Sequence, residues 1–461
     1  MDDISFGTDG WRATLDVFTD ERVRAVGQAV ADYLHTSETA GTVAVGYDAR
    51  DTSRGFAESL CDVLTANDID CLLPERDVPT PVLAWTVRDR GLAGGLMVTA
   101  SHNPPEYNGV KFIPETGAPA LPAVTDRLEA NLRPASAANN SGTTTEASLV
   151  DPYLEHARTL VETDLSGLTV AYDAMHGSGR GVTDRLLEQS GANIRRLRTE
   201  RDSTFGGTPP EPTGERLGEL VRLVKTGEAD IGVANDGDAD RLGVVTPGRG
   251  YLDPNRYFAA IYDHLLTVHT EGRDETGDAI RTVSTTFLID RVAEAHGQRA
   301  HETAVGFKWV AEAMQEHGAL VGGEESGGFG LADHLPNKDG VAFALVTAAA
   351  EARESFDARV DRVLAEHGDV VQDRVSVDCP DDRKVAVVNA LDDRIPETVA
   401  GVAVDQVVTV DGFKLLLADG SWLLVRPSGT EPKLRVYAEA NSEKRTKALL
   451  AEGESLVAPL V

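Results

Sequence analysis

Segments of strand character alternate with segments of helical periodicity along the first third of the chain, and this alternation limits the possible folds. Residues 42–48 and 94–100 are apolar, strand-like runs, whereas 21–34 and 54–64 repeat apolar residues at helical spacing. Such alternation predicts a mainly parallel sheet covered by helices. Ligands of these sheets bind at the carboxyl ends of the strands. Ser101 directly follows one predicted strand, so we expect it in a ligand crevice.

A second unit of the chain resembles the first. Residues 45–56 (VGYDARDTSRGF) and 170–182 (VAYDAMHGSGRGV) share a short strand, a Tyr-Asp-Ala turn and a helix start, if one insertion is allowed. The second unit ends in a predicted strand, 229–235, that runs straight into the aspartate-rich segment 236–241 (DGDADR). We therefore predict α/β domains of related topology, each with a polar loop at the carboxyl end of a strand.

Changes in character divide the 461 residues into four predicted domains. The small, polar residues of 134–148 indicate a linker, and a helix-rich unit opens at 251–255 (YLDPN). From Asp373 onward, short strands with Asp-Gly turns indicate an α+β domain. The predicted fold class is α/β, with three mixed α/β domains and a C-terminal α+β domain. The predicted boundaries are 1–148, 149–250, 251–368 and 369–461.

The formal net charge of -31 excludes nucleic acid and anionic membranes as partners held by bulk charge. An anionic substrate would need a local basic pocket. The excess of Asp and Glu, with only nine lysines among 44 basic residues, indicates a halophilic protein of a salt-rich cytoplasm; an ordinary acidic soluble enzyme is the alternative. The three cysteines form no CxxC pair, so we expect no disulfide scaffold.

The amino terminus is acidic and polar, unlike a signal peptide. The longest apolar stretches, such as 341–350, fall well short of the ~20 residues that cross a bilayer. We therefore expect a cytoplasmic protein with no membrane partner.

Two motifs carry the predicted chemistry. Ser101 in TASHNP (99–104) is an isolated nucleophile in a loop, and Asp236, Asp238 and Asp240 are closely spaced carboxylates. Hard divalent cations such as Mg2+ prefer carboxylate oxygens. Together the motifs indicate phosphoryl transfer through a phosphoserine beside a bound metal.

Other interpretations of these motifs remain open. An EF-hand loop is excluded, because Arg241 and Pro247 stand where Gly and Glu would be required. An aspartyl-phosphate enzyme of the haloacid dehalogenase type would use the first aspartate, Asp236, as its nucleophile. Without chemistry, the aspartates would form a solvated acidic turn, and Ser101 would be a turn serine.

Two further loops suit a phosphorylated sugar. Residues 323–328 (GEESGG) offer two carboxylates and a hydroxyl, which match sugar hydroxyls. Residues 426–433 (RPSGTEPK) offer an arginine, hydroxyls and backbone amides that can jointly hold a phosphate. The first of these loops could instead be a surface turn. The dipeptide Gly-Lys never occurs, which excludes a Walker-type phosphate loop.

The order of these motifs resembles that of the α-D-phosphohexomutases, the phosphoglucomutase and phosphomannomutase enzymes, along the whole chain. The segments that carry the resemblance are FGTDGWRA (6–13), TASHNPPEYNGVK (99–111), DGDADR (236–241), GEESGG (323–328) and RPSGTEPKLRVY (426–437).

The resemblance implies an isomerase whose domains surround one central cleft. Its expected reaction interconverts a sugar 1-phosphate and a sugar 6-phosphate, glucose first and mannose second, through a phosphoserine and a bisphosphate. Alternatives are a phosphoglucosamine mutase or phosphopentomutase of the same family, a metal-dependent phosphomonoesterase, and a silent sugar-phosphate binding protein. The oligomeric state is left open between monomer and dimer.

The resemblance also implies the site. Ser101 matches the phosphorylated serine and a metal ligand, and the three aspartates match the other Mg2+ ligands, with a sugar 1,6-bisphosphate as activator. Arg12 and Lys111 match basic groups beside the reacting phosphate. The positions matched to substrate binding are Arg241, Val305, Gly306, Glu324, Ser326, Arg426, Ser428, Gly429 and Thr430.

One position departs from part of the family. Gly328 stands where some members have a histidine. His334 and Lys338 then become candidates for substrate contact and proton transfer, and the identity of the general acid/base stays open.

Overall fold

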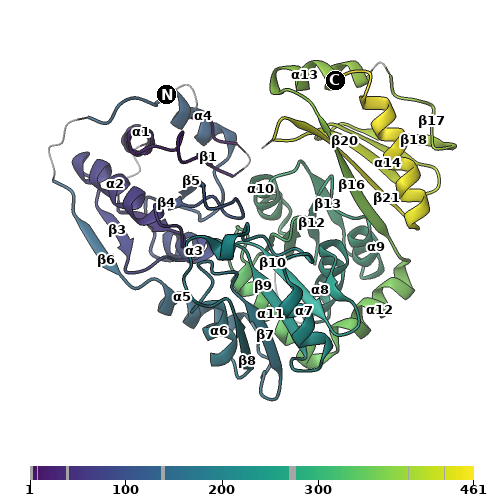
Figure 1. Ribbon diagram of the computed structural model, residues 1–461, viewed down its shortest axis with the longest axis horizontal. Coiled ribbons are helices and arrows are strands. Elements are labelled where there is room, and N and C mark those ends of the chain that lie inside the picture. Colours follow the sequence, from purple (N-terminus) through teal and green to yellow (C-terminus); the bar gives the residue numbers. More distant parts are fainter. Residues whose placement is uncertain are drawn as a thin grey trace.

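The computed structural model describes residues 4–7, 9–37, 41–136, 141–268, 277–392, 394–429 and 431–461. Within them, four sheets follow one another along the chain, each with its own helices (Figure 1). The first and last sheets lie at opposite sides of the view, and the second and third lie between and below them.

The first sheet has six strands, five of which precede the segment predicted as a linker. In sheet order they are β1 (Trp11–Thr14), β5 (Tyr107–Pro114), β4 (Gly94–Val98), β2 (Val43–Tyr47), β3 (Cys71–Pro74) and β6 (Thr144–Ala147). The helices of this unit are α1 (Asp20–Thr36), α2 (Ser53–Ala66), α3 (Thr80–Asp89) and α4 (Pro122–Ala130). The predicted linker is therefore partly a strand, because β6 pairs with β3 in parallel.

The second and third sheets are smaller. The second runs β11 (Gly250–Leu252), β10 (Leu242–Thr246), β9 (Ile231–Asn235), β7 (Thr169–Asp173) and β8 (Asn193–Leu197), with α5 (Val150–Ala157), α6 (Thr183–Gln189) and α7 (Gly218–Lys225). The third runs β13 (Ala300–Thr303), β12 (Ala279–Thr282), β14 (Val321–Gly323) and β15 (Phe329–Leu331). Its helices are α8 (Pro254–Val268), α9 (Leu288–Ala295), α10 (Phe307–His317), α11 (Gly340–Arg353) and α12 (Phe356–His367). The second sheet reaches two residues past the predicted boundary at residue 250, because β11 pairs with β10.

The first three sheets share one four-stranded topology. In each, a first strand lies between its two parallel neighbours, and a fourth strand runs antiparallel to the third. The equivalent third and fourth strands are β4–β5, β9–β10 and β14–β15. This confirms the prediction of three mixed α/β domains with related topology.

The fourth sheet is antiparallel throughout, as predicted for an α+β domain. Its order is β16 (Val371–Asp378), β21 (Lys433–Ala440), β20 (Trp422–Pro427), β19 (Phe413–Leu417), β18 (Val402–Val408) and β17 (Thr398–Val399), with α13 (Asp381–Asp392) and α14 (Glu443–Val457). Asp-Gly turns connect β18 to β19 and β19 to β20.

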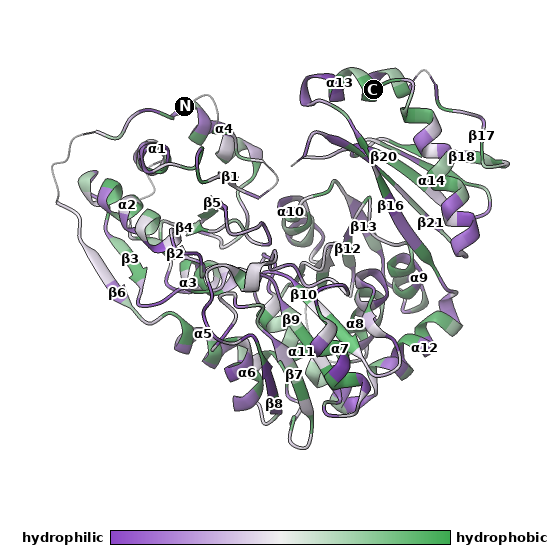
Figure 2. Ribbon diagram, viewed as in Figure 1, coloured by the Kyte–Doolittle hydropathy of each residue, from purple (hydrophilic) through white to green (hydrophobic). Residues whose placement is uncertain are grey.

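Differences in burial explain why some strands are apolar in sequence and others are polar. The central strands β2 and β9 are buried on both faces, which is why they are continuous apolar runs. Figure 2 shows β9 as hydrophobic but the edge strands β8 and β16 as largely hydrophilic. Charged edge strands discourage pairing with other chains.

The first three domains share a continuous core. Trp85 of α3, Tyr153 of α5 and Phe343 of α11 belong to one cluster of buried side chains, and α11 also packs on β9 and α6 of the second domain. A separate small cluster joins the fourth domain to the third, with Trp422 packed near Phe287. Among the described residues, no helix combines the length and apolar character needed to cross a bilayer.

Candidate active site

Each domain contributes one antiparallel hairpin loop to the site. These loops follow β4, β9, β14 and β20, and they contain the four motifs predicted from the sequence. A cleft of about 900 Å³ is lined by residues of all four domains. Predicted site residues among its lining are Arg12, Arg241, Val305, Glu324, Ser326, Lys338, Arg426, Ser428 and Gly429. Thr430 lies outside the described residues.

Ser101 is held at the edge of this cleft. Its side chain is buried, and its Oγ donates a hydrogen bond of 2.7 Å to Asp236 Oδ2. Its neighbours His102 and Asn103 line the cleft. The φ of Ser101 is +50°, a left-handed conformation that costs a non-glycine residue about 1–3 kcal/mol. The surrounding structure must therefore hold this serine in place.

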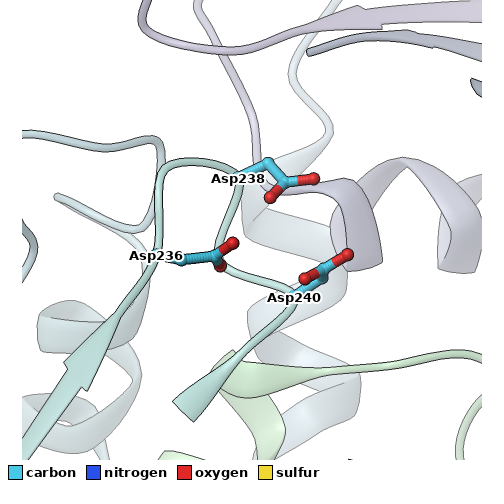
Figure 3. Close-up of side chains that lie close together, drawn as sticks. All are labelled: Asp236, Asp238 and Asp240. Atoms are coloured by element: carbon cyan, nitrogen blue, oxygen red, sulfur yellow. The ribbon is translucent and has the colours of Figure 1, made fainter. Parts of the chain in front are cut away.

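Asp236, Asp238 and Asp240 lie together, with one oxygen of each within 4.8 Å of the others (Figure 3). All three are fully buried. Thr80 Oγ1 donates a 2.6 Å hydrogen bond to Asp238 Oδ2, but no donor among the described residues reaches Asp238 Oδ1 or Asp240 Oδ1. Buried carboxylate oxygens without partners are costly, and a hard divalent cation would satisfy them. The aspartates therefore fit a metal ion.

Two lysines balance the charge of these aspartates. Lys111 Nζ lies 2.9 Å from both Asp238 Oδ2 and Asp240 Oδ2, and 2.8 Å from Asp9 Oδ2. Lys338 Nζ lies 2.9 Å from Asp240 Oδ2 and 3.2 Å from Asp9 Oδ2. Although burial opposes the charge of Lys111, the neighbouring carboxylates raise its pKa well above its usual value. Asp9 belongs to the segment FGTDGWRA (6–13), but its role could not be predicted from the sequence.

The predicted metal loop (236–241, after β9) and the predicted sugar loop (324–328, after β14) are joined through their backbones. Leu242 N–H donates to the carbonyl of Gly327 at 2.9 Å, and Arg241 forms an isolated β-bridge with Gly328. Glu324 Oε1 accepts a 3.0 Å hydrogen bond from Gly306 N–H. Burial raises the pKa of Glu324 to about 7. Gly306 therefore helps to orient Glu324 through its backbone N–H.

Gly328 explains the position of Lys338. A Cβ at residue 328 would lie 2.4 Å from Lys338 Cδ, so a side chain there would collide with the lysine.

His334, in contrast, is not among the residues that line the cleft. It is 3% exposed, its Nε2 lies 2.6 Å from Asp339 Oδ2, and its Nδ1 lies 2.9 Å from His156 Nε2. Its position does not support the predicted substrate contact, because domain packing buries the ring.

The predicted phosphate loop, which follows β20 and contains Ser428 and Gly429, is hydrogen-bonded by a lysine of α13. Lys384 Nζ donates to the carbonyls of Ser428 at 2.6 Å and Glu431 at 2.5 Å. Arg426 Nε donates to Asp411 Oδ2 at 2.9 Å, and Val305 N–H donates to the same oxygen at 3.1 Å. Asp411 thus links the third and fourth domains beside the cleft. Sequence motifs could not reveal Lys384 or Asp411, since both lie outside the motif segments.

Arg12 contacts the serine loop, which is the segment 99–106 between β4 and β5. Its Nη1 is 3.4 Å from Asn103 Oδ1, and its Nη2 is 3.5 Å from Asp9 Oδ2. Both predicted basic groups contact Asp9 Oδ2, but Arg12 lines the open cleft whereas Lys111 contacts the aspartates.

Models of phosphoglucomutase/phosphomannomutase domains match nearly the whole chain. They are alpha/beta/alpha domain I at residues 3–138, domain II at 151–250, domain III at 253–367 and the C-terminal domain at 374–454.

Whole-length relatives agree with these matches. A Methanopyrus kandleri protein assigned as a phosphoglucosamine mutase is 33% identical over 457 residues, covering 98% of this chain and 97% of the relative. A phosphoglucomutase/phosphomannomutase of Thermococcus kodakarensis is 29% identical over 464 residues, covering 98% of each. A Thermus thermophilus crystal structure, assigned as a phosphomannomutase, superposes with a TM-score of 0.85 at 31% identity and 99% coverage of both chains. The chain is therefore a phosphohexomutase of the phosphoglucomutase/phosphomannomutase family.

Proposed function

We propose that this mutase interconverts a sugar 1-phosphate and a sugar 6-phosphate through a phosphoserine at Ser101. The observation that carries the proposal is the 2.7 Å hydrogen bond from Ser101 Oγ to Asp236 Oδ2, inside a carboxylate cluster that fits a metal. Asp236, Asp238 and Asp240 would hold Mg2+. When bound, the cation supplies charge neutralisation at the phosphoryl oxygens.

The residues of the cleft support both halves of the reaction. A sugar hydroxyl oxygen forms a bond to phosphorus as the bond from Ser101 Oγ breaks, and the hydroxyl proton passes to Glu324. The departing Ser101 Oγ lies beside Asp236, where a bound cation would offset its charge. Burial raises the pKa of Glu324 to about 7, which suits a general base near neutral pH. The bisphosphate then turns end for end, and its other phosphate returns to Ser101. The loop of Arg426 and Ser428 holds the distal phosphate in each orientation.

The phosphoserine is tested by peptide mass mapping of protein treated with a sugar 1,6-bisphosphate. We expect phosphate on Ser101 that excess sugar monophosphate removes, and Ser101→Ala should lower turnover by several orders of magnitude. Phosphate on Asp236 or Asp238 would support the aspartyl-phosphate mechanism instead. Free phosphate without an isomerised sugar would identify a phosphomonoesterase.

Glucose phosphates are the proposed substrates, with mannose phosphates tolerated. Glu324 and Ser326 line the cleft on the sugar loop and can pair with adjacent hydroxyls. A site built to pair with hydroxyls discriminates against sugars that leave those groups unmatched. Measuring kcat/KM for glucose, mannose, glucosamine and ribose phosphates would identify the preferred sugar. A tenfold preference for glucosamine or ribose phosphate over glucose phosphate would overturn this choice of sugar.

One observation favours glucosamine phosphate as a second candidate. Glu325 also lines the cleft, and among the described residues its Oε2 accepts two long hydrogen bonds, of 3.4 Å, from the hydroxyls of Thr282 and Thr285. We infer that this carboxylate can pair with an ammonium group of the substrate. If glucosamine is a substrate, Glu325→Gln should lower kcat/KM for glucosamine 6-phosphate and leave glucose 6-phosphate little changed. Equal effects on both sugars would remove the argument.

A further inference from the structure

Arg50 lies behind the serine loop and uses its whole guanidinium group to hold it. The side chain is 2% exposed. A guanidinium has five N–H donors, and all five are engaged here. Their acceptors are Asp48 Oδ2 (3.0 Å) and the carbonyl oxygens of Ser101 (3.0 Å), Asn103 (2.7 Å), Pro104 (2.6 Å) and Tyr107 (3.1 Å).

Four carbonyl oxygens that point at one place repel one another unless a cation lies between them. Arg50 supplies that charge, and its planar group fixes the direction of each carbonyl. Asp48 anchors the guanidinium and also accepts 2.7 Å from Thr99 Oγ1, which itself accepts from Ser101 N–H at 2.8 Å. The backbone on both sides of Ser101 is therefore tied to one buried ion pair.

Residues of the second domain cover the Arg50 guanidinium and contact the serine loop. The ring of Phe205 covers the Arg50 guanidinium with its centroid 5.0 Å away, and Phe205 is 1% exposed. A Cβ at Gly237 of the metal loop would lie 2.5 Å from the Ser101 carbonyl oxygen, so the two loops touch backbone to backbone. Arg50 and Gly237 thus confine the same carbonyl, while Asp236 holds the Oγ of the same residue.

We propose that Arg50 is a positioning residue for phosphoryl transfer. It sets the left-handed backbone of Ser101 and thereby aims Oγ at the metal loop, without touching the substrate, since it is not among the residues that line the cleft. Lysine is no substitute, because an ammonium has three donors and cannot span four carbonyls and a carboxylate. The inference rests on the proposed phosphoserine chemistry.

The test compares Arg50→Lys with Arg54→Lys. Arg54 is an exposed arginine of the neighbouring helix α2 and pairs with Glu58 at 2.9 Å, so it serves as a matched control. Each full-length protein is phosphorylated with glucose 1,6-bisphosphate, and its phosphoserine content is measured by intact mass. The rate of phosphate transfer to glucose 6-phosphate in a single turnover is then divided by that content.

We expect Arg50→Lys to transfer phosphate about a hundredfold more slowly per phosphoserine, because small misplacements cost about that much. KM should stay within a few-fold of the original value, and Arg54→Lys should match the unaltered protein. A normal rate per phosphoserine in folded Arg50→Lys would overturn the inference. A lack of phosphoserine in the unaltered protein would overturn the proposed function instead.

Phe205→Leu decides the question if Arg50→Lys fails to fold. Leucine preserves burial but removes the aromatic face above the guanidinium. The inference requires a several-fold slower transfer per phosphoserine with KM unchanged. An unchanged transfer rate in this variant would overturn it.

Discussion

The absence of a side chain at Gly328 is what lets Lys338 reach the aspartates. Lys338 Nζ lies 2.9 Å from Asp240 Oδ2, and a Cβ at residue 328 would lie 2.4 Å from Lys338 Cδ. Gly328→Ala should therefore displace the lysine and lower kcat by about tenfold or more, since a catalytic group moved by about 1 Å can cost roughly 10²-fold. Steady-state kinetics with saturating Mg2+ would measure the loss.

The matched control for this change is Gly55→Ala. Gly55 lies in α2, and a Cβ there meets no atom within 4 Å. Alanine should leave kcat unchanged and add up to about 1 kcal/mol of stability, because glycine disfavours helices. Unaltered kcat in Gly328→Ala would show that Lys338 is not needed in its present position.

At the scale of elements, Glu351 at the end of α11 holds the start of α12. Its Oε2 accepts a 2.6 Å hydrogen bond from Phe356 N–H, and burial raises the pKa of this carboxyl to about 7. Because the pKa in the folded state lies above the ordinary value of 4.5, the folded protein loses stability as pH rises from about 4.5 through 7.

Glu351→Gln should remove this pH dependence. Glutamine keeps an acceptor for Phe356 N–H but carries no charge, so the variant should gain on the order of 1–3 kcal/mol at about pH 8 and little at about pH 4.5. Denaturant unfolding at several pH values across this range would measure the difference. Glu366→Gln, an exposed position on α12, is the control. A gain at the acidic end as large as that at the alkaline end would contradict the explanation.

The central elements were predictable because their burial dictates their residues. The fully buried strands β2 and β9 are almost entirely apolar, and the polar loops after β4 and β9 stand out against them. Strand β6 was hidden within a predicted linker, because its residues are mostly exposed and it is held only at a sheet edge. Its pairing with β3 depends on a long-range contact that local sequence does not encode.

Only part of the candidate site could be predicted from the sequence. Motifs singled out Ser101 and the aspartates as candidates, but the supporting groups behind the loops depend on where distant backbone carbonyls converge. Arg50 lies about fifty residues before its four carbonyl acceptors, and Lys384 lies over forty before its own. The role of His334 stays a prediction: it lies close to Lys338 in the sequence, but its ring is buried against His156 of α5.

For the whole molecule, the net charge of -31 predicts a dependence on salt. Carboxylates repel one another over about 30 Å at about 0.01 M salt but only about 3 Å at about 1 M. Screening should weaken the repulsion more than it weakens exposed ion pairs, each worth about 0–1 kcal/mol. Tm and activity should rise with KCl into the molar range. A Tm that is flat or falling between dilute buffer and molar KCl would refute the halophilic interpretation and leave the enzymatic one intact.

The first three domains place their working loops at the same point of the same framework, between the third strand and its antiparallel neighbour. In the proposed mechanism, one carries the nucleophile, one the acidic ligands of the metal, and one the sugar contacts. Gene duplication followed by specialisation would produce this division of labour without rebuilding a sheet. It would also make the chain adaptable, because changes to the predicted sugar contacts in residues 324–328 leave unchanged the loops that are proposed to handle phosphate.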